Sequence, residues 1–259
     1  MYPPELPCIS NRVLYIYRVL AKWFSFFFFG LGTMILLLII FPPMRLFLHP
    51  KDRFRKYGRR FISSSLRFFV SVMHFIGIVN LEFGSRESYR NLRSKIIVAN
   101  HPSLLDVIML LSLVPNADCI AAGYLNRSIL RGVIRQLYIL SSNDFNDILK
   151  ACLESIEQGN CLIIFPEGTR TPRTGKNIVK KGAARIALHS ACNILPIHIG
   201  GTDKYGLGKH DPWTAFNPRE RYVYRLSIRE EIQIEKYKDL PQPAAARVIT
   251  KDISATLQL

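Results

Sequence analysis

The sequence has few acidic residues and no cysteine arrangement typical of a metal site. Aspartate and glutamate number 19 against 35 lysines and arginines, which gives a formal net charge of +16. The five cysteines are scattered and include no CxxC pair, which argues against both a structural zinc site and a disulfide framework. We therefore expect no metal centre, and we expect partners that carry negative charge.

Two motifs that would indicate other functions, nucleic-acid binding and serine hydrolysis, are also missing. No nucleic-acid-binding signature accompanies the positive charge, so we expect no nucleic-acid partner. No GxSxG elbow occurs either, which removes the usual setting of a nucleophilic serine in an α/β hydrolase. An anionic membrane surface and negatively charged substrates remain as partners for a chain of this charge.

One stretch near the N-terminus has no charged residue. Residues 23–41 read WFSFFFFGLGTMILLLIIF, and at about 1.5 Å per residue they nearly cross a hydrocarbon core of roughly 30 Å. A signal peptide has a shorter apolar region and a small-residue cleavage site, whereas Pro42, Pro43 and a basic run follow here. We predict that residues 1–80 form a membrane-anchoring helical segment with its apolar span at about 23–41.

The charge around this segment predicts an orientation. Between residues 45 and 67 basic side chains recur and Asp52 is the only acid, so the positive-inside rule places this flank in the cytoplasm, against anionic lipid head groups. We expect the inner (cytoplasmic) membrane, with the remainder of the chain, residues 81–259, on its cytoplasmic side. The apolar stretch 68–81 is short and contains His74, and it favours an interfacial or buried helix. A hairpin or a half-buried pair of helices is the alternative to a single span.

The remainder, residues 81–259, alternates between short apolar runs and helical spacing. This alternation predicts an α/β domain with a mostly parallel central sheet flanked by helices. Residues 221–234 favour a further strand or a hairpin, and the Gly- and Pro-rich residues 200–218 favour a long surface loop. The expected strands are 96–99, 119–122, 161–165 and 194–199, and the expected helices begin near Leu104 and cover 145–156 and 178–191.

A first polar cluster, NHPSLLD, follows the predicted strand 96–99. In such sheets sites gather at the carboxyl ends of strands. A carboxylate at Asp106 could hold the tautomer of His101, which would then act as general base on a substrate hydroxyl. The alternative is that Asp106 caps a helix and His101 is an ordinary turn residue.

A second cluster, PEGTR, follows the predicted strand 161–165. Gly168 permits close approach of the backbone to a ligand, and Arg170 offers a planar fork for a phosphate or carboxylate. No acid occurs between Gly168 and Thr202, while several basic residues do, among them Lys180 and Lys181. The alternative is a solvated basic loop.

Together the clusters resemble a known family. NHPSLLD is similar to the NHxxxxD block of the glycerolipid (lysophosphatidic acid, PlsC-type) acyltransferases, and FPEGTR matches their second block letter for letter. The stretch ILPIHIG, with Pro196, resembles their last block, and Lys180 and Lys181 fall in the stretch between. The resemblance covers roughly residues 80–205.

The resemblance implies an activity. His101 would be the general base and Asp106 its orienting carboxylate. The acceptor would be the hydroxyl of a lysophospholipid or related lipid, the donor acyl-CoA or acyl-carrier protein, and no metal or organic cofactor would take part. The acceptor site would be shaped by Glu167, Gly168, Thr169, Arg170, Lys180 and Lys181.

One block departs from the family pattern. The arginine that often lies between the two main motifs is missing from residues 137–143, and Arg127, Arg131 and Arg135 lie upstream. Hydroxyl and amide groups at Ser141, Ser142 and Asn143 suit a less charged acceptor better than a phosphomonoester. This departure predicts poor use of lysophosphatidate. The sequence also resembles family members associated with aryl polyene lipid assembly.

Two other functions remain open at the sequence level. A thioesterase-like hydrolase could use the same His–Asp pair on an activated water. A catalytically silent, membrane-anchored lipid-binding protein could keep the fold, although both motifs are intact. Dependence of product formation on an acceptor separates the transferase from the hydrolase, and dependence on His101 separates both from the binding protein.

Overall fold

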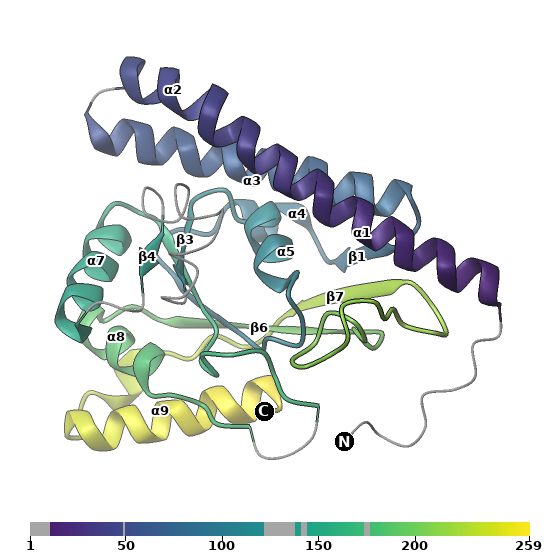
Figure 1. Ribbon diagram of the computed structural model, residues 1–259. Helices are drawn as coiled ribbons and strands as arrows, with labels where there is room; N and C mark the ends of the chain where they lie inside the picture. Colours follow the sequence, from purple (N-terminus) through teal and green to yellow (C-terminus); the bar gives the residue numbers. More distant parts are fainter. Residues whose placement is uncertain (1–10, 49, 122–137, 141–143, 174–176) are drawn as a thin grey trace.

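A seven-stranded sheet forms the centre of the molecule, with strand order β1-β7-β6-β2-β5-β3-β4 (Figure 1). The computed structural model describes all residues except 1–10, 49, 122–137, 141–143 and 174–176. The strands are β1 (Val79–Phe83), β2 (Ile96–Ala99), β3 (Ala117–Ala121), β4 (Ile139–Leu140), β5 (Cys161–Ile164), β6 (Ile194–Gly201) and β7 (Tyr222–Ile228).

The sheet is mostly parallel, as the alternation of strands and helices predicts. β2 pairs in parallel with both β5 and β6, β3 pairs in parallel with β5 and β4, and β1 pairs in parallel with β7. The antiparallel pair is β6 with β7. This pair brings the residues that follow β6 beside the middle of β7, which becomes important at the active site.

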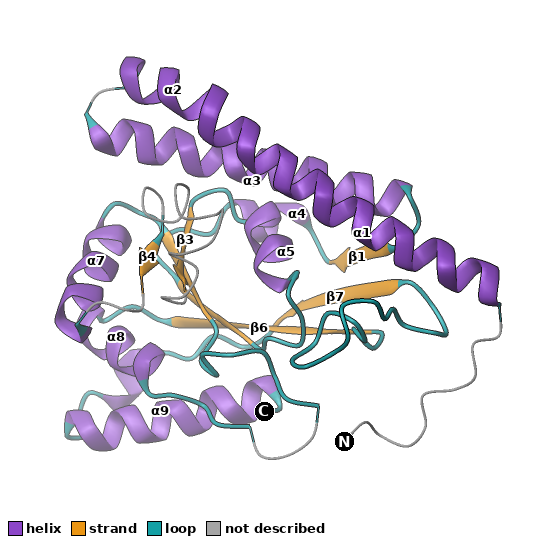
Figure 2. Cartoon of the chain, viewed as in Figure 1, coloured by secondary structure: helices purple, strands orange, loops and turns teal. Residues whose placement is uncertain are grey.

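Helices cover both faces of the sheet (Figure 2). Successive residues of a strand point to opposite faces, so Ile97 and Ala99 join the apolar core under α1, α3 and α5 while Ile96 and Val98 join the core under α7, α8 and α9. The helices are α1 (Arg12–Ile35), α2 (Phe41–Phe47), α3 (Lys51–Phe75), α4 (Arg86–Arg90), α5 (Asp106–Leu113), α7 (Phe145–Glu157), α8 (Gly182–Ser190) and α9 (Gln242–Leu257).

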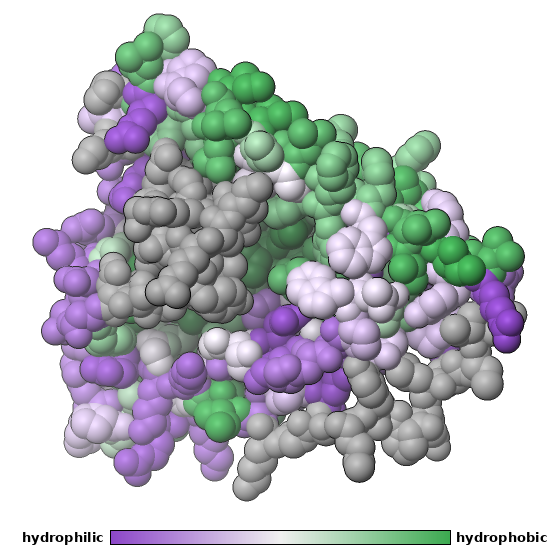
Figure 3. All heavy atoms as spheres, viewed as in Figure 1, coloured by the Kyte–Doolittle hydropathy of each residue, from purple (hydrophilic) through white to green (hydrophobic). Residues whose placement is uncertain are grey.

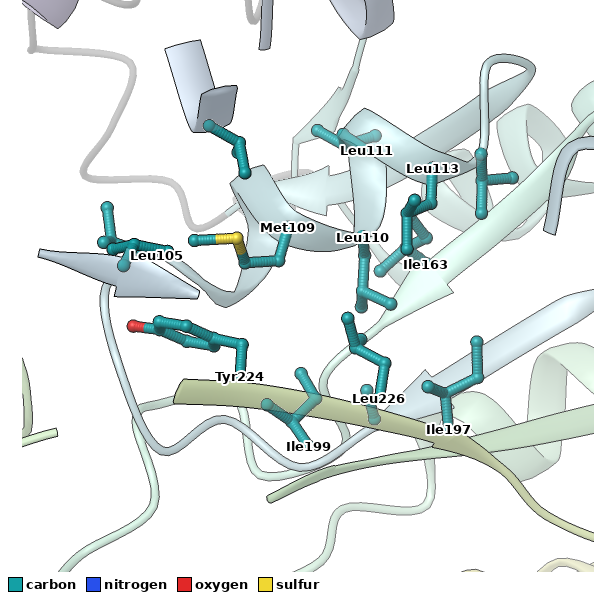
Figure 4. Packing of buried hydrophobic residues seen from close by; sticks show 14 of the residues in the cluster. Leu105, Met109, Leu110, Leu111, Leu113, Ile163, Ile197, Ile199, Tyr224 and Leu226 are labelled. Carbon is teal, nitrogen blue, oxygen red and sulfur yellow. The ribbon is translucent and has the colours of Figure 1, made fainter. Parts of the chain in front are cut away.

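Helix α5 packs tightly on the sheet, which fixes its first residue, Asp106. Figure 4 shows Met109 and Leu110 of α5 directed towards the strands, where Tyr224 and Leu226 of β7 lie below them. All four of these side chains are buried in one apolar cluster. Burial of large side chains such as these contributes about 1.5–3 kcal/mol each, so the start of α5 is held firmly against β7.

The N-terminal segment forms a helical hairpin. α1 continues through a π-helical turn, Leu36–Ile40, into α2, and α3 runs back beside them (Figure 1). Pro42 and Pro43 lie near the start of α2, directly after the π-helical turn. Their missing N–H groups are tolerated there because the regular helical hydrogen bonding is already interrupted by that turn. Within the part of the chain that the structure describes, the helix Arg12–Phe47 is the one long and apolar enough to cross a membrane.

The first half of this apolar helix is packed against the catalytic domain. Lys22 is only 2% exposed, and its ammonium donates hydrogen bonds to the carbonyls of Trp213, at 2.7 Å, and of Ala215. Ala21 and Ser25 are also buried. The burial of this lysine, directly before the predicted apolar span, is thus explained by a polar contact with the loop between β6 and β7.

The basic stretch that follows does not all face outward. Arg59 of α3 is buried and forms a two-pronged ion pair with Asp118 of β3, at 2.6 and 2.8 Å, and Ser155 of α7 donates a further hydrogen bond to Asp118. Arg59 therefore ties the hairpin to the sheet, whereas Arg53, Arg55, Lys56 and Arg60 are exposed as the positive flank predicts.

Several sequence predictions need correction. Residues 68–81 are not one helix, because α3 ends at Phe75 and β1 begins at Val79. The loop 200–218 is not a plain surface loop, since Lys204, Leu207 and Phe216 within it are buried. The sequence did not predict α9. For residues 221–234 the first of the two alternatives is confirmed, since they contain one strand, β7. The division into residues 1–80 and 81–259 stays a prediction.

Candidate active site

His101 and Asp106 meet at the carboxyl end of β2. His101 lies in the turn after the strand and Asp106 is the first residue of α5, so the turn brings the two side chains together. The distance between His101 Nδ1 and Asp106 Oδ2 is 2.8 Å. The Asp106 side chain is 0% exposed and that of His101 is 17% exposed, so the carboxylate is buried and the imidazole reaches the surface.

Three hydrogen bonds fix the orientation of the Asp106 carboxylate. Besides the contact with His101, Oδ2 accepts from the Ser103 backbone N–H at 2.7 Å, and Oδ1 accepts from the Ser103 hydroxyl at 2.7 Å. An ionised carboxylate can only accept, so His101 Nδ1 carries the proton in this contact. The lone pair is then on Nε2, which is the tautomer that a general base requires.

Glu167 supports His101 through the backbone. Its Oε1 accepts from the His101 N–H at 3.0 Å and from the Thr171 hydroxyl at 2.7 Å, and the Thr171 N–H donates to the His101 carbonyl at 2.6 Å. The imidazole also stacks on Phe165, with 4.2 Å between ring centroids. The FPEGTR stretch therefore holds the His101 turn in place.

Gly168 and Lys180 lie against each other. Gly168 has a φ of +67°, and a β-carbon there would fall 2.6 Å from the Lys180 ammonium. Any other residue would have to adopt a strained backbone and displace this lysine. Thr169 and Lys181 are exposed, and Lys181 is the N-cap residue of α8. Of the two predicted lysines, Lys180 thus contacts the PEGTR motif, whereas Lys181 lies at the start of α8.

Arg170 borders a small cavity next to this motif. Its Nη1 donates to the carbonyls of Leu207 and Gly208, at 3.0 and 2.8 Å, so the guanidinium has a fixed orientation. The cavity has a volume of about 190 Å³, enough for a small head group. It is lined by Leu104, Arg170, Gly206, Leu207, Gly208, His210, Asp211 and Trp213.

The sequence did not identify every residue of this site. Thr171 lies beside a recognised motif, but nothing in its spacing signals a contact with His101. Tyr224 donates to or accepts from the Ser103 hydroxyl at 2.8 Å, and Lys204 lies over the Tyr224 ring. Both contacts join distant parts of the chain. Most of the middle block, 137–143, lies outside the described residues, as do Arg127, Arg131 and Arg135.

Comparison with known proteins places these residues in a family. Residues 80–200 match the Acyltransferase family. The chain is 29% identical over 211 residues to the chloroplastic 1-acyl-sn-glycerol-3-phosphate acyltransferase LPAT1 of Arabidopsis thaliana, covering 78% of this chain and 55% of the relative. It is 35% identical over 138 residues to the 1-acyl-sn-glycerol-3-phosphate acyltransferase of Helicobacter pylori, covering 50% of this chain and 57% of the relative. The matches thus span little more than half of each relative's length.

A solved structure agrees with the fold. The crystal structure of the 1-acyl-sn-glycerophosphate acyltransferase PlsC from Thermotoga maritima has a TM-score of 0.65 and 21% identity, covering 94% of this chain and 96% of that one. At this identity the likeness concerns the fold. The narrower resemblance to aryl polyene proteins stays a prediction. The stretch that matches the Acyltransferase family, residues 80–200, includes both motifs, so the chain is similar to these acyltransferases in the part that holds the candidate site.

Proposed function

We propose that the protein transfers a fatty acyl group from acyl-CoA or acyl-carrier protein to the free hydroxyl of a lysophospholipid. The observation that carries this proposal is the 2.8 Å contact between His101 and the buried Asp106, within the motif of an acyltransferase domain. The first acceptor to consider is 1-acyl-sn-glycerol-3-phosphate, because the curated relatives are named for it.

The chemistry follows from the geometry. Nε2 of His101 removes the proton of the acceptor hydroxyl while its oxygen attacks the thioester carbonyl carbon. The tetrahedral intermediate collapses, the C–S bond breaks, and the imidazolium gives its proton to the leaving thiolate. Asp106 stabilises the imidazolium between these two steps, and the new ester and the free thiol leave together with no residual charge. No protein nucleophile and no metal takes part.

One assay distinguishes acyl transfer from hydrolysis and from lipid binding alone. With purified protein and a thioester donor, mass spectrometry should detect the acylated acceptor, and thiol release should depend on the acceptor. Thiol release at the same rate without an acceptor would indicate a hydrolase. No turnover with any donor and acceptor pair would favour a lipid-binding protein.

The acceptor preference gives the first prediction. We expect lysophosphatidate to be acylated in preference to neutral lysolipids at equal concentration, with Arg170 at the cavity binding the phosphate. Arg170→Met should raise the acceptor KM about tenfold or more, since a charge-assisted hydrogen bond contributes roughly 1.5–3 kcal/mol. The donor KM should change little, and Arg229→Met, at an exposed arginine after β7, is the matched control.

The sequence analysis favours the opposite acceptor preference, and the same competition assay tests it. The missing middle-block arginine predicts that lysophosphatidate is a poor acceptor. Preferred acylation of a neutral or hydroxylated lipid, with lysophosphatidate left largely unreacted in the competition, would establish that alternative. An unchanged KM in Arg170→Met would remove Arg170 from the acceptor site.

We also propose that the helical hairpin attaches the protein to the inner (cytoplasmic) membrane, with the active site on the cytoplasmic side. Hydrophobic side chains gather along the outer face of α1 and the π-helical turn after it (Figure 3), among them Phe27 of α1 and Leu38 of the turn, which are each 69% exposed. Apolar patches of this extent favour contact with lipid. Because Lys22 is bound to the catalytic domain, a helix pair lying in one leaflet suits this contact better than a full crossing by α1.

Membrane attachment gives the second prediction. The double variant Phe27→Lys with Leu38→Lys should float with liposomes several-fold less than the wild type, because each lysine opposes insertion of an apolar face. Val248→Lys, on α9 across the sheet, is the control and should float normally. Flotation of the double variant at the wild-type level, or release of the wild type by high salt alone, would contradict insertion of this face.

A further inference from the structure

Lys204 is a buried lysine beside the active site. It lies in the loop after β6 and is 5% exposed. Its ammonium donates to the Val223 carbonyl at 2.8 Å, to the Gly200 carbonyl at 3.4 Å and also to the Thr202 carbonyl. The antiparallel pairing of β6 and β7 creates this group of carbonyls, because it places the end of β6 next to the middle of β7.

The same ammonium is connected to the catalytic carboxylate. It lies 4.7 Å from the centroid of the Tyr224 ring. The hydroxyl of that tyrosine is 2.8 Å from the Ser103 hydroxyl, which in turn donates to Asp106 at 2.7 Å. Lys204 is thus linked through Tyr224 and the Ser103 hydroxyl to Oδ1 of Asp106, whereas Oδ2 contacts His101.

Charge balance distinguishes Lys204 from a purely structural residue. Neutral donors could satisfy three carbonyls, whereas a buried ammonium has a desolvation cost of several kcal/mol unless a negative charge offsets it. Asp106 is 0% exposed and has no other full positive charge among its hydrogen-bonding partners. Each ion therefore compensates for the burial of the other.

We propose that Lys204 is a positioning residue that acts through Asp106, its positive charge stabilising the negative charge of the buried carboxylate that orients His101. This inference rests on the proposed function. Lys204 acts through its electric field at Asp106 and not by contact with the reacting atoms.

The other acidic residues near Lys204 do not take the place of Asp106 as its counter-charge. Asp203 is bound by Arg173 at 2.6 and 2.7 Å, and Glu220 is exposed. Tyr224, whose ring lies against the ammonium, stays neutral because burial raises the pKa of its hydroxyl, and burial does the same for Tyr222 on the same strand. Burial lowers the pKa of Lys204 to about 8, while Asp106, Asp203 and Glu220 act to raise it. The ammonium is therefore charged at pH 7 and below, where the base must work.

The test is the pH profile of kcat/KM in two matched variants. Lys204→Gln and Lys204→Arg both keep N–H donors for the carbonyls, but only the second keeps the charge. A positive charge favours the state of the pair with one proton fewer. Its removal in Lys204→Gln should therefore shift the acidic limb of the profile upward by about half a pH unit or more. Lys204→Arg should restore the wild-type limb.

A third variant separates the effect of the Lys204 charge from that of the Tyr224 hydroxyl and does not require folding of the two Lys204 variants. Tyr224→Phe removes the hydroxyl but keeps both the ring and the Lys204 charge, so its acidic limb should stay within about 0.2 pH units of the wild type. An unmoved limb in folded Lys204→Gln, equal shifts in the Gln and Arg variants, or a Tyr224→Phe shift as large as the Gln shift would each overturn the proposal. Absence of acyl transfer by the wild type would instead refute the proposed function.

Discussion

Replacing His101 with alanine should lower turnover by about three orders of magnitude or more, because it removes the group that takes the proton from the acceptor hydroxyl. The imidazole is partly exposed and its loss opens no cavity in the core, so folding should be preserved. The measurement is the rate of acceptor-dependent thiol release by the wild type and the variant. Liposome flotation should be the same for both, since the hairpin is unchanged.

A matched histidine gives the control. His189 lies in the last turn of α8 and is exposed, so His189→Ala should keep wild-type turnover. If His101→Ala retained turnover within a factor of ten of the wild type, His101 could not be the base. The site would then have to work by binding and orienting the two substrates, which on its own yields a much smaller acceleration.

The parts of the fold that the sequence predicted well are those with local signals. β2 has the predicted bounds, Ile96–Ala99, because a strand covered on both faces reads as an unbroken apolar run. α7 begins at Phe145, as predicted, and Asp144 caps it by accepting from the Asn146 N–H. β1 reads VNLEF, a short apolar–polar alternation typical of a half-buried strand, and it was missed because the apolar stretch before it was extended to Leu81.

The site shows the same division between local and distant information. His101 and Asp106 are five residues apart, so a single turn decides their meeting and the motif reveals it. Ser103 and Tyr224 are 121 residues apart, and their contact depends on the strand order and on the register of β7. No pattern in one sequence specifies such a register. Lys204 is hidden for the same reason, since a lysine in a Gly-rich loop ordinarily indicates solvent exposure.

Replacing Asp106 with asparagine should lower turnover by about 10³- to 10⁴-fold, by analogy with the loss of the correct tautomer in the Ser-His-Asp triad. The amide has nearly the same shape as the carboxylate and can still accept from the Ser103 N–H. It lacks the negative charge that stabilises the imidazolium, and its NH₂ group can turn towards His101 and reverse the tautomer. Turnover should be measured beside Asp239→Asn, an exposed site that serves as control.

This substitution also tests the plainest alternative for Asp106, which is a role at the helix terminus alone. Asparagine keeps the shape and the acceptor oxygen and loses only a charge in the first turn of α5, a change of about 0.3–1 kcal/mol, so a residue that only stabilises α5 would tolerate it. A near-normal rate in Asp106→Asn, with thermal stability kept, would reduce Asp106 to that structural role. A rate lowered by three orders of magnitude in a protein that melts like the wild type has a different cause. The buried charge of Asp106, held by Ser103 and facing His101 at 2.8 Å, would then be required for the chemistry.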